Sequence, residues 1–96
     1  MKKYEIMYIL NSSMEEEARQ KLVETLHAII TDGKGTIDSV DEWGMKEFAY
    51  RIDDMTKGYY VVTKFTAEPE VVEELDRICR INANVVRNMI VSLEER

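Results

Sequence analysis

The residues that could carry out catalysis are few in this chain. It has one histidine, His27, and one cysteine, Cys79, in different segments. Nucleophilic catalysis needs a base beside its nucleophile, and a zinc site needs several closely spaced ligands. Gly33-Lys34-Gly35 superficially resembles a phosphate loop, but it follows a helical pattern instead of preceding one. We therefore expect no enzymatic activity, catalytic residue, metal, cofactor or small-molecule substrate.

The two residues with the most reactive side chains have simpler interpretations. Cys79 lies on the apolar stripe of a predicted helix, so we expect a small core residue. His27 lies at the edge of another helix's apolar face, and we expect a partly exposed side chain without a role. A single cysteine forms no internal disulfide, which fits a reducing cytosol. We also expect no signal peptide, no membrane span and a cytoplasmic location.

The net charge of −6 argues at first against nucleic acid, because phosphate binding needs a basic surface. The charges are unevenly distributed, however. Residues 12–33 and 68–81 together hold ten acidic and four basic residues, a net of −6. Residues 1–11, 57–67 and 82–93 hold five basic residues and one acidic residue, a net of +4. Either the acidic segments are simply solvated, or one side of the molecule is able to bind RNA.

The hydrophobic pattern predicts six elements in the order β-α-β-β-α-β. The expected strands are residues 3–10, 36–52, 59–65 and 85–93, and the expected helices lie within 12–33 and 68–81. This order is typical of the ferredoxin-like α+β arrangement, a four-stranded antiparallel sheet with two helices on one face. We expect one such domain over residues 1–96, with the other sheet face uncovered and available for binding.

Local signals predict how some elements end. Ser12 and Ser13 each precede a glutamate by three positions, the spacing of a capping box at a helix start. Gly33 is expected to close the first helix in the left-handed conformation. The apolar spacing slips near Gly44, which indicates a bulge or kink in the long second strand. Residues 53–58 read as the turn of a hairpin.

One alternative for the aromatic strands is a domain of the RNA-recognition-motif type. Residues 57–65 partly resemble the first ribonucleoprotein motif, and residues 7–11 partly resemble its companion. Val61 stands where that motif has a base-stacking aromatic residue, and Tyr60 stands where it has glycine or alanine. The topology is the same, so this alternative stays open.

The register of the strands separates the two interpretations. Lys64 is costly to bury without a partner, so its side of the strand should face solvent. Tyr60 and Val62 share that side and should form an exposed apolar patch, which would need a partner. The opposite side should face the helices, with Tyr59, Val61 and Phe65 from this strand and Tyr4, Ile6, Tyr8 and Leu10 from the first. The alternative would instead display Tyr8 and Val61 to RNA.

Several motifs then extend along the chain: Lys3-Tyr4-Glu5, the segment from Trp43-Gly44 through Phe48-Ala49-Tyr50 to Ile52, Gly58-Tyr59, Leu75, Arg80, Ile81 and Arg87. In these motifs and their spacing, the sequence from Met1 to about Val91 resembles the bacterial family of small-subunit ribosomal protein six. The resemblance implies a ferredoxin-like fold and a non-catalytic role in the small ribosomal subunit. It further implies binding to 16S ribosomal RNA in company with small-subunit ribosomal protein eighteen.

The resemblance and the register together name candidate site residues. The candidate RNA contacts are Lys2, Lys3, Lys46 and Arg87. The candidate partner contacts are Tyr60, Val62 and Arg80. The family usually has two adjacent basic residues after Trp43-Gly44, whereas this chain has Lys46-Glu47, so a contact at position 47 should not carry over.

The large apolar pair Trp43 and Met45 lies near the expected kink, where it would belong either to the core or to an interface. We expect Trp43 in the core. A third functional class also stays open, a small metabolite-sensing domain of the same fold that dimerises through its sheet.

Overall fold

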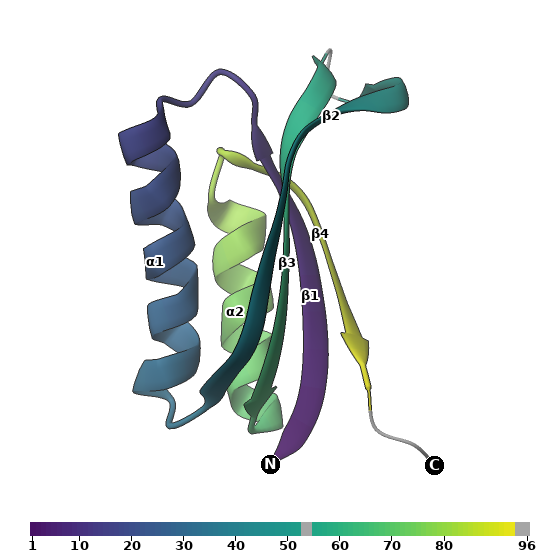
Figure 1. Ribbon diagram of the computed structural model, residues 1–96. Coiled ribbons are helices and arrows are strands. Elements are labelled where there is room, and N and C mark those ends of the chain that lie inside the picture. Colours follow the sequence, from purple (N-terminus) through teal and green to yellow (C-terminus); the bar gives the residue numbers. More distant parts are fainter. Residues whose placement is uncertain (53–54, 94–96) are drawn as a thin grey trace.

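The computed structural model describes residues 1–52 and 55–93 of the chain. Its elements are β1 (Lys2–Asn11), α1 (Glu16–Asp32), β2 (Thr36–Ile52), β3 (Met55–Ala67), α2 (Pro69–Ile81) and β4 (Val85–Ser92). The strands form one antiparallel sheet in the order β2-β3-β1-β4. Both helices cover the same face of it (Figure 1). The predicted fold class is therefore confirmed. Among the described residues, no helix is long and apolar enough to cross a membrane.

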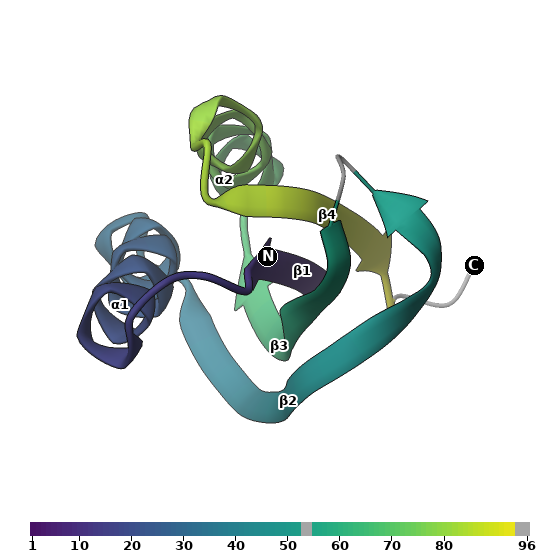
Figure 2. The same ribbon diagram turned by 90° about the horizontal axis from the view of Figure 1, so that it is seen from above.

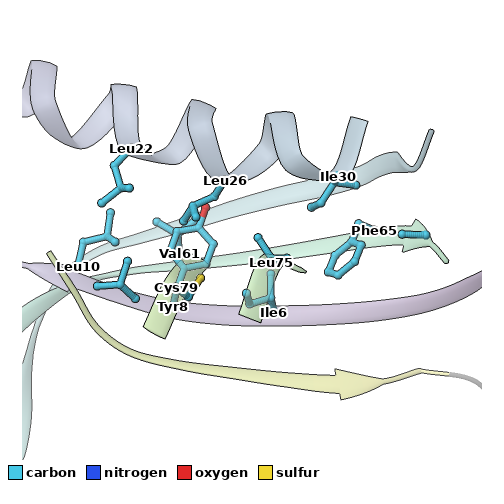
Figure 3. Packing of buried hydrophobic residues seen from close by; sticks show 12 residues of the cluster. Ile6, Tyr8, Leu10, Leu22, Leu26, Ile30, Val61, Phe65, Leu75 and Cys79 are labelled. Carbon is cyan, nitrogen blue, oxygen red and sulfur yellow. The ribbon is translucent and has the colours of Figure 1, made fainter. Parts of the chain in front are cut away.

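The core lies between the two helices and the inner face of the sheet. In β1, Ile6, Tyr8 and Leu10 are buried, because alternate residues of a strand point to the same side. Tyr8 pairs with Val61 of β3, so the inner faces of these neighbouring strands meet the helices together. The close-up in Figure 3 shows the helix residues that complete the cluster: Leu22, Leu26, Ile30, Leu75 and Cys79. The predicted inward register is confirmed, as is the core position of Cys79.

The start of α1 differs from the prediction. The N-cap residue is Glu15, and no side chain caps the helix. Ser13 is used elsewhere: its backbone N–H and its hydroxyl both donate to Asn11 Oδ1, at 2.9 and 2.8 Å. This Asx turn leads the chain out of β1, and it places both serines before the N-cap. The predicted capping box is therefore wrong.

The end of α1 also differs. Gly33 has φ −84°, and the left-handed residue is Lys34, with φ 68°. The glycine is needed for a different reason, since a Cβ atom there would collide with Cγ2 of Val71 in α2. Gly33 therefore allows the two helices to approach each other.

The hairpin of β2 and β3 is longer than predicted. β3 begins at Met55, so most of the expected turn over residues 53–58 is strand, while Asp53 and Asp54 lie outside the described residues. Glu47 pairs with Lys57, beyond the end of β1. The two strands continue there because each satisfies the other's backbone groups. Figure 1 shows this distal part of the hairpin projecting past β1.

Candidate nucleic-acid interface

The outer face of the sheet, opposite the helices, has no helix over it. Viewed from above, both helices lie on the far side and β2 curves around the sheet (Figure 2). The register places Arg87 of β4, Ile9 of β1, Tyr60 of β3 and Gly44 of β2 in one row across the four strands. Residues paired in this way project to the same face. This row of four residues crosses one end of the outer face, and its basic residue, Arg87, lies on the β4 side.

Trp43 lies at the other side of that row, and the kink in β2 explains its position. Gly44 has φ +87°, and the pairing with β3 shifts between Glu42 and Gly44, so the predicted bulge is confirmed. The bulge turns the Trp43 ring onto Tyr60, with 6.1 Å between ring centroids and 7° between planes. Trp43 Nε1 also donates to Asp41 Oδ2 at 3.0 Å.

Trp43 is consequently a surface residue, 47% exposed, and its predicted core position is wrong. Sequence spacing alone does not reveal this, because the bulge changes which side of the strand the ring occupies. Lys46 Nζ lies 5.7 Å from the centroid of the Trp43 ring, within range of a cation–π contact. The β2 side of the row thus ends in an exposed aromatic ring and a lysine.

The four candidate RNA contacts fall into two groups. Lys46 and Arg87 lie at the two sides of the row just described. Lys2 and Lys3 lie at the opposite end of β1, where they pair with Ala67 and Thr66. At about 3.3 Å per residue, Lys3 is roughly 20 Å from the row. The structure therefore places Lys46 and Arg87 at the two sides of one row, on opposite edge strands, and Lys2 and Lys3 at the other end of β1, where successive side chains point to opposite faces.

The candidate partner contacts are also separated. Tyr60 is half-buried under Trp43, and Val62 is only 7% exposed, so the expected exposed patch of these two residues is wrong. Arg80 lies on α2, on the other side of the sheet, where it pairs with Asp76 at 3.0 Å.

The apolar surface that is exposed on the outer face lies beside Val62, not on it. Met89 of β4 is 54% exposed, and Val91 and Trp43 are also exposed. Met89 pairs with Met7, and Met7 pairs on its other side with Val62, so the side chains of these three residues form a row on the outer face. We call Trp43, Tyr60, Met89 and Val91 the outer patch. Sequence reasoning missed Met89 and Val91, although their alternation with Asn88 and Ile90 was the available signal.

The one histidine has a structural role that sequence reasoning missed. Nε2 of His27 lies 3.1 Å from Thr63 Oγ1 and 3.3 Å from Tyr8 Oη. Both partners project from the inner face of the sheet and are buried. Burial lowers the pKa of His27, and the charge of Glu42 acts in the opposite direction. His27 is therefore a polar link between α1 and the sheet.

No reactive centre accompanies this link in the described part of the chain. Burial raises the pKa of the Cys79 thiol to about 11, with the charge of Asp76 contributing, so the thiolate is suppressed at neutral pH. Across residues 1–52 and 55–93, no group of three His, Cys, Asp or Glu side chains is placed to hold a metal ion.

A cleft of about 370 Å³ separates the start of α1 from the hairpin. On its wall, the guanidinium of Arg19 lies 4.0 Å from the centroid of the Tyr59 ring. Tyr59 Oη donates to Glu42 Oε1 at 2.6 Å, and this bond is the main cause of a raised Tyr59 pKa. These contacts attach α1 to the hairpin that carries Trp43 and Lys46.

Burial decides against the RNA-recognition-motif alternative. Tyr8 is 1% exposed and Val61 is fully buried, whereas that alternative displays both to RNA. Desolvation also raises the pKa of Tyr8 above its ordinary value, as expected for a phenol inside the core. Base stacking on these two positions is therefore excluded.

Comparison with known proteins gives one consistent result. The model of the family described as ribosomal protein S6 matches residues 3–92. A small ribosomal subunit protein bS6 of Exiguobacterium sibiricum is 44% identical over 95 residues, 99% of this chain and 100% of that protein. The protein of the same name from Alkaliphilus oremlandii is 45% identical with the same coverage. The crystal structure of 30S ribosomal protein S6 from Thermotoga maritima superposes with a TM-score of 0.90 at 34% identity, covering 95% of this chain and 86% of that one.

Proposed function

Because this chain belongs to the ribosomal protein S6 family, we propose that it is a structural, non-catalytic component of the small ribosomal subunit in the cytoplasm. In this proposal it binds 16S ribosomal RNA together with small-subunit ribosomal protein eighteen. The observation that carries the proposal is the row on the outer face, where Lys46 and Arg87 flank exposed apolar side chains. Basic residues contact phosphates, and the apolar side chains between them suit a second protein.

The RNA contacts follow from where the basic residues lie. Lys46 and Arg87 are the proposed phosphate contacts at one end of the sheet, and Lys2 and Lys3, on opposite faces of β1, are those at the other end. The acidic helices on the far side repel RNA that approaches from there. A site with so few cations binds RNA weakly, since few counterions are released. The protein alone therefore binds weakly, and a partner protein is needed to complete the site.

The partner contact is centred on the outer patch. Tyr60 contributes from beneath Trp43, and Val62 supports the patch from below without being exposed itself. Arg80 lies on the helix side, so it touches the partner through a separate contact.

The test of the RNA proposal is the anisotropy of a labelled fragment from the central domain of 16S ribosomal RNA, titrated with and without the partner. The partner should raise affinity at least about tenfold, which corresponds to about 1.4 kcal/mol of coupling. Lys46→Ala and Lys3→Ala should each weaken the complex, while Lys21→Ala, on the exposed side of α1, should not. Tight binding without the partner would contradict the proposal.

A second experiment tests the outer patch. Met89→Asp should reduce binding of the partner protein, because a carboxylate in an apolar contact loses its hydration without gaining a partner. The matched control is Ile81→Asp, since Ile81 is 67% exposed but lies on α2. Equal effects of the two substitutions would place the partner elsewhere.

Tight binding of a small metabolite by a dimer of the purified protein would instead favour the metabolite-sensing class.

A further inference from the structure

The two edges of the sheet are built differently. β2, at one edge, contains six charged residues, and its pairing with β3 is interrupted by three register shifts. Charges and bulges of this kind protect an edge against further strands. β4, at the other edge, contains one charged residue, Arg87, and its pairing with β1 is irregular only between Ile9 and Leu10, at the start of β4. The β4 edge is therefore the unprotected one.

The backbone of β4 presents hydrogen-bonding groups along this edge. The Leu93 N–H donates to the Lys3 carbonyl oxygen at 2.9 Å, which fixes the alternation of the antiparallel pair. Met89 and Arg87 are an even number of residues from Leu93, so their backbone N–H and C=O groups also point toward β1. Asn88 and Ile90 direct theirs to the outside. An additional strand would thus find donors and acceptors at the centre of β4.

A groove runs beside these two residues, between β4 and α2, with a volume of about 500 Å³. Figure 2 shows α2 lying along β4 on the helix side of the sheet. The apolar part of its lining comes from Tyr4, Val72 and Ile90. Glu73, Asp76 and Arg80 of α2 also line it. Asp76 pairs with Arg80 at 3.0 Å and accepts a hydrogen bond from Asn88 Nδ2 at 2.9 Å. The groove thus combines an apolar floor with a wall that holds two carboxylates and one guanidinium, a net charge of −1.

Charge complementarity indicates what fits there. α2 holds four acidic and two basic residues, a net of −2. A second copy of this chain would bring another helix of the same charge to the edge, and RNA would meet the same carboxylates, so both are disfavoured. A basic segment is favoured.

We propose that β4 accepts an additional strand from a partner protein, an extended segment in which basic and apolar residues alternate. The basic side chains enter the groove toward Glu73, because Asp76 already pairs with Arg80, and the apolar side chains lie beside Met89 and Val91 on the outer face. Main-chain hydrogen bonds to Asn88 and Ile90 supply part of the affinity, and the alternating side chains supply the specificity. The added strand would begin next to Arg87 of β4, which belongs to a proposed phosphate site, but its hydrogen bonds use Asn88 and Ile90 at the free edge instead of the Arg87 side chain.

The probe for this surface is a short capped peptide in which valine and lysine alternate, and amide hydrogen exchange is followed by NMR. Bound peptide should slow exchange at Asn88 and Ile90, while the amides of β2 stay unchanged. A peptide with glutamate in place of lysine is the control and should not bind. Protection along β2, equal binding of the acidic peptide, or no binding of the basic peptide would overturn the proposal.

Substitutions on the helices test whether the carboxylates of the groove contribute to peptide binding. Glu73→Gln should weaken peptide binding about two- to threefold, the size expected for one exposed charge pair. Glu17→Gln, an equivalent change on α1, should leave it unaltered. Glu73→Gln should also leave RNA binding unaltered, so failure here is distinguishable from failure of the RNA proposal. Sedimentation showing a peptide-independent dimer with protected Asn88 and Ile90 amides would assign the edge to a second copy instead.

Discussion

Nε2 of His27 lies 3.1 Å from Oγ1 of Thr63, so the one histidine of the chain joins the middle of α1 to the centre of the sheet. Thr63 is fully buried, and its hydroxyl needs a partner there because water does not reach it. Tyr8 Oη shares the same nitrogen at 3.3 Å. The position of α1 over β1 and β3 therefore depends on a polar contact as well as on apolar packing.

Replacing His27 by leucine should destabilise the protein by about 1–3 kcal/mol, because two buried hydroxyl groups lose a shared partner. His27→Gln keeps a polar group and should cost less. Urea denaturation gives the free energies of unfolding. The double variant His27→Leu/Thr63→Val removes one of the orphaned hydroxyls and should be more stable than His27→Leu alone. Additive losses in the double variant would show that the contact contributes little.

The same contact predicts a pH dependence. The folded-state pKa of His27 lies below the ordinary 6.5, first because of burial, with Glu42 opposing. Between those two pKa values the unfolded chain binds more protons than the folded one, so the free energy of unfolding falls as the pH is lowered. The stabilisation that comes from the neutral form of His27 in the folded protein is fully present above about pH 7. Unfolding curves from pH 7.5 to 5 should show the decline, and His27→Gln should remove it, since free carboxyl groups titrate near pH 4.

Cys79 should react slowly with thiol reagents in the folded protein. Its side chain is buried in the core cluster and burial raises its pKa to about 11, so both access and thiolate are limited. Labelling with a disulfide reagent at pH 8 should be slow in buffer and fast in urea. Rapid labelling of the folded chain would contradict the core position.

The sequence predicted the elements that local pattern determines. Alternation in β1 and β3 identified the inner face, because a charged residue such as Lys64 marks the solvent side. The side chains that were wrongly predicted depend on contacts between distant segments. His27 acquires its role only because α1 crosses over Thr63, and Trp43 becomes exposed only because a bulge turns it onto Tyr60. The candidate site residues stay predictions, and their grouping was not accessible from the sequence, since only the strand order shows that Lys46 and Arg87 share one end of the sheet.

Gly44 should be required for the position of Trp43. Its φ of +87° is costly for alanine, although no atom lies within 4 Å of an added Cβ, so the penalty is one of backbone conformation. Gly44→Ala should cost about 1–2 kcal/mol and shift the fluorescence of the one tryptophan as the ring leaves Tyr60. Gly44→Asn, which tolerates this conformation better, should have a smaller effect. An unchanged spectrum in Gly44→Ala would mean that stacking, not the glycine, positions the ring.

The separation of the two basic sites can be measured through the salt dependence of RNA binding. Each phosphate contact contributes somewhat less than one unit to the slope of log affinity against log salt. If the four candidate contacts, Lys2, Lys3, Lys46 and Arg87, all engage together, the slope should be about −3 to −4. An RNA that reaches only one end of the sheet should give a slope of about −2. Because Lys3 is roughly 20 Å from Arg87 along the sheet, a short RNA fragment should show the smaller slope, and the fragment bound with the partner should show the larger one. Arg87→Ala should flatten both slopes by about one unit, whereas Lys3→Ala should flatten only the larger. A Lys3 effect of equal size in both complexes would show that the two sites act as one.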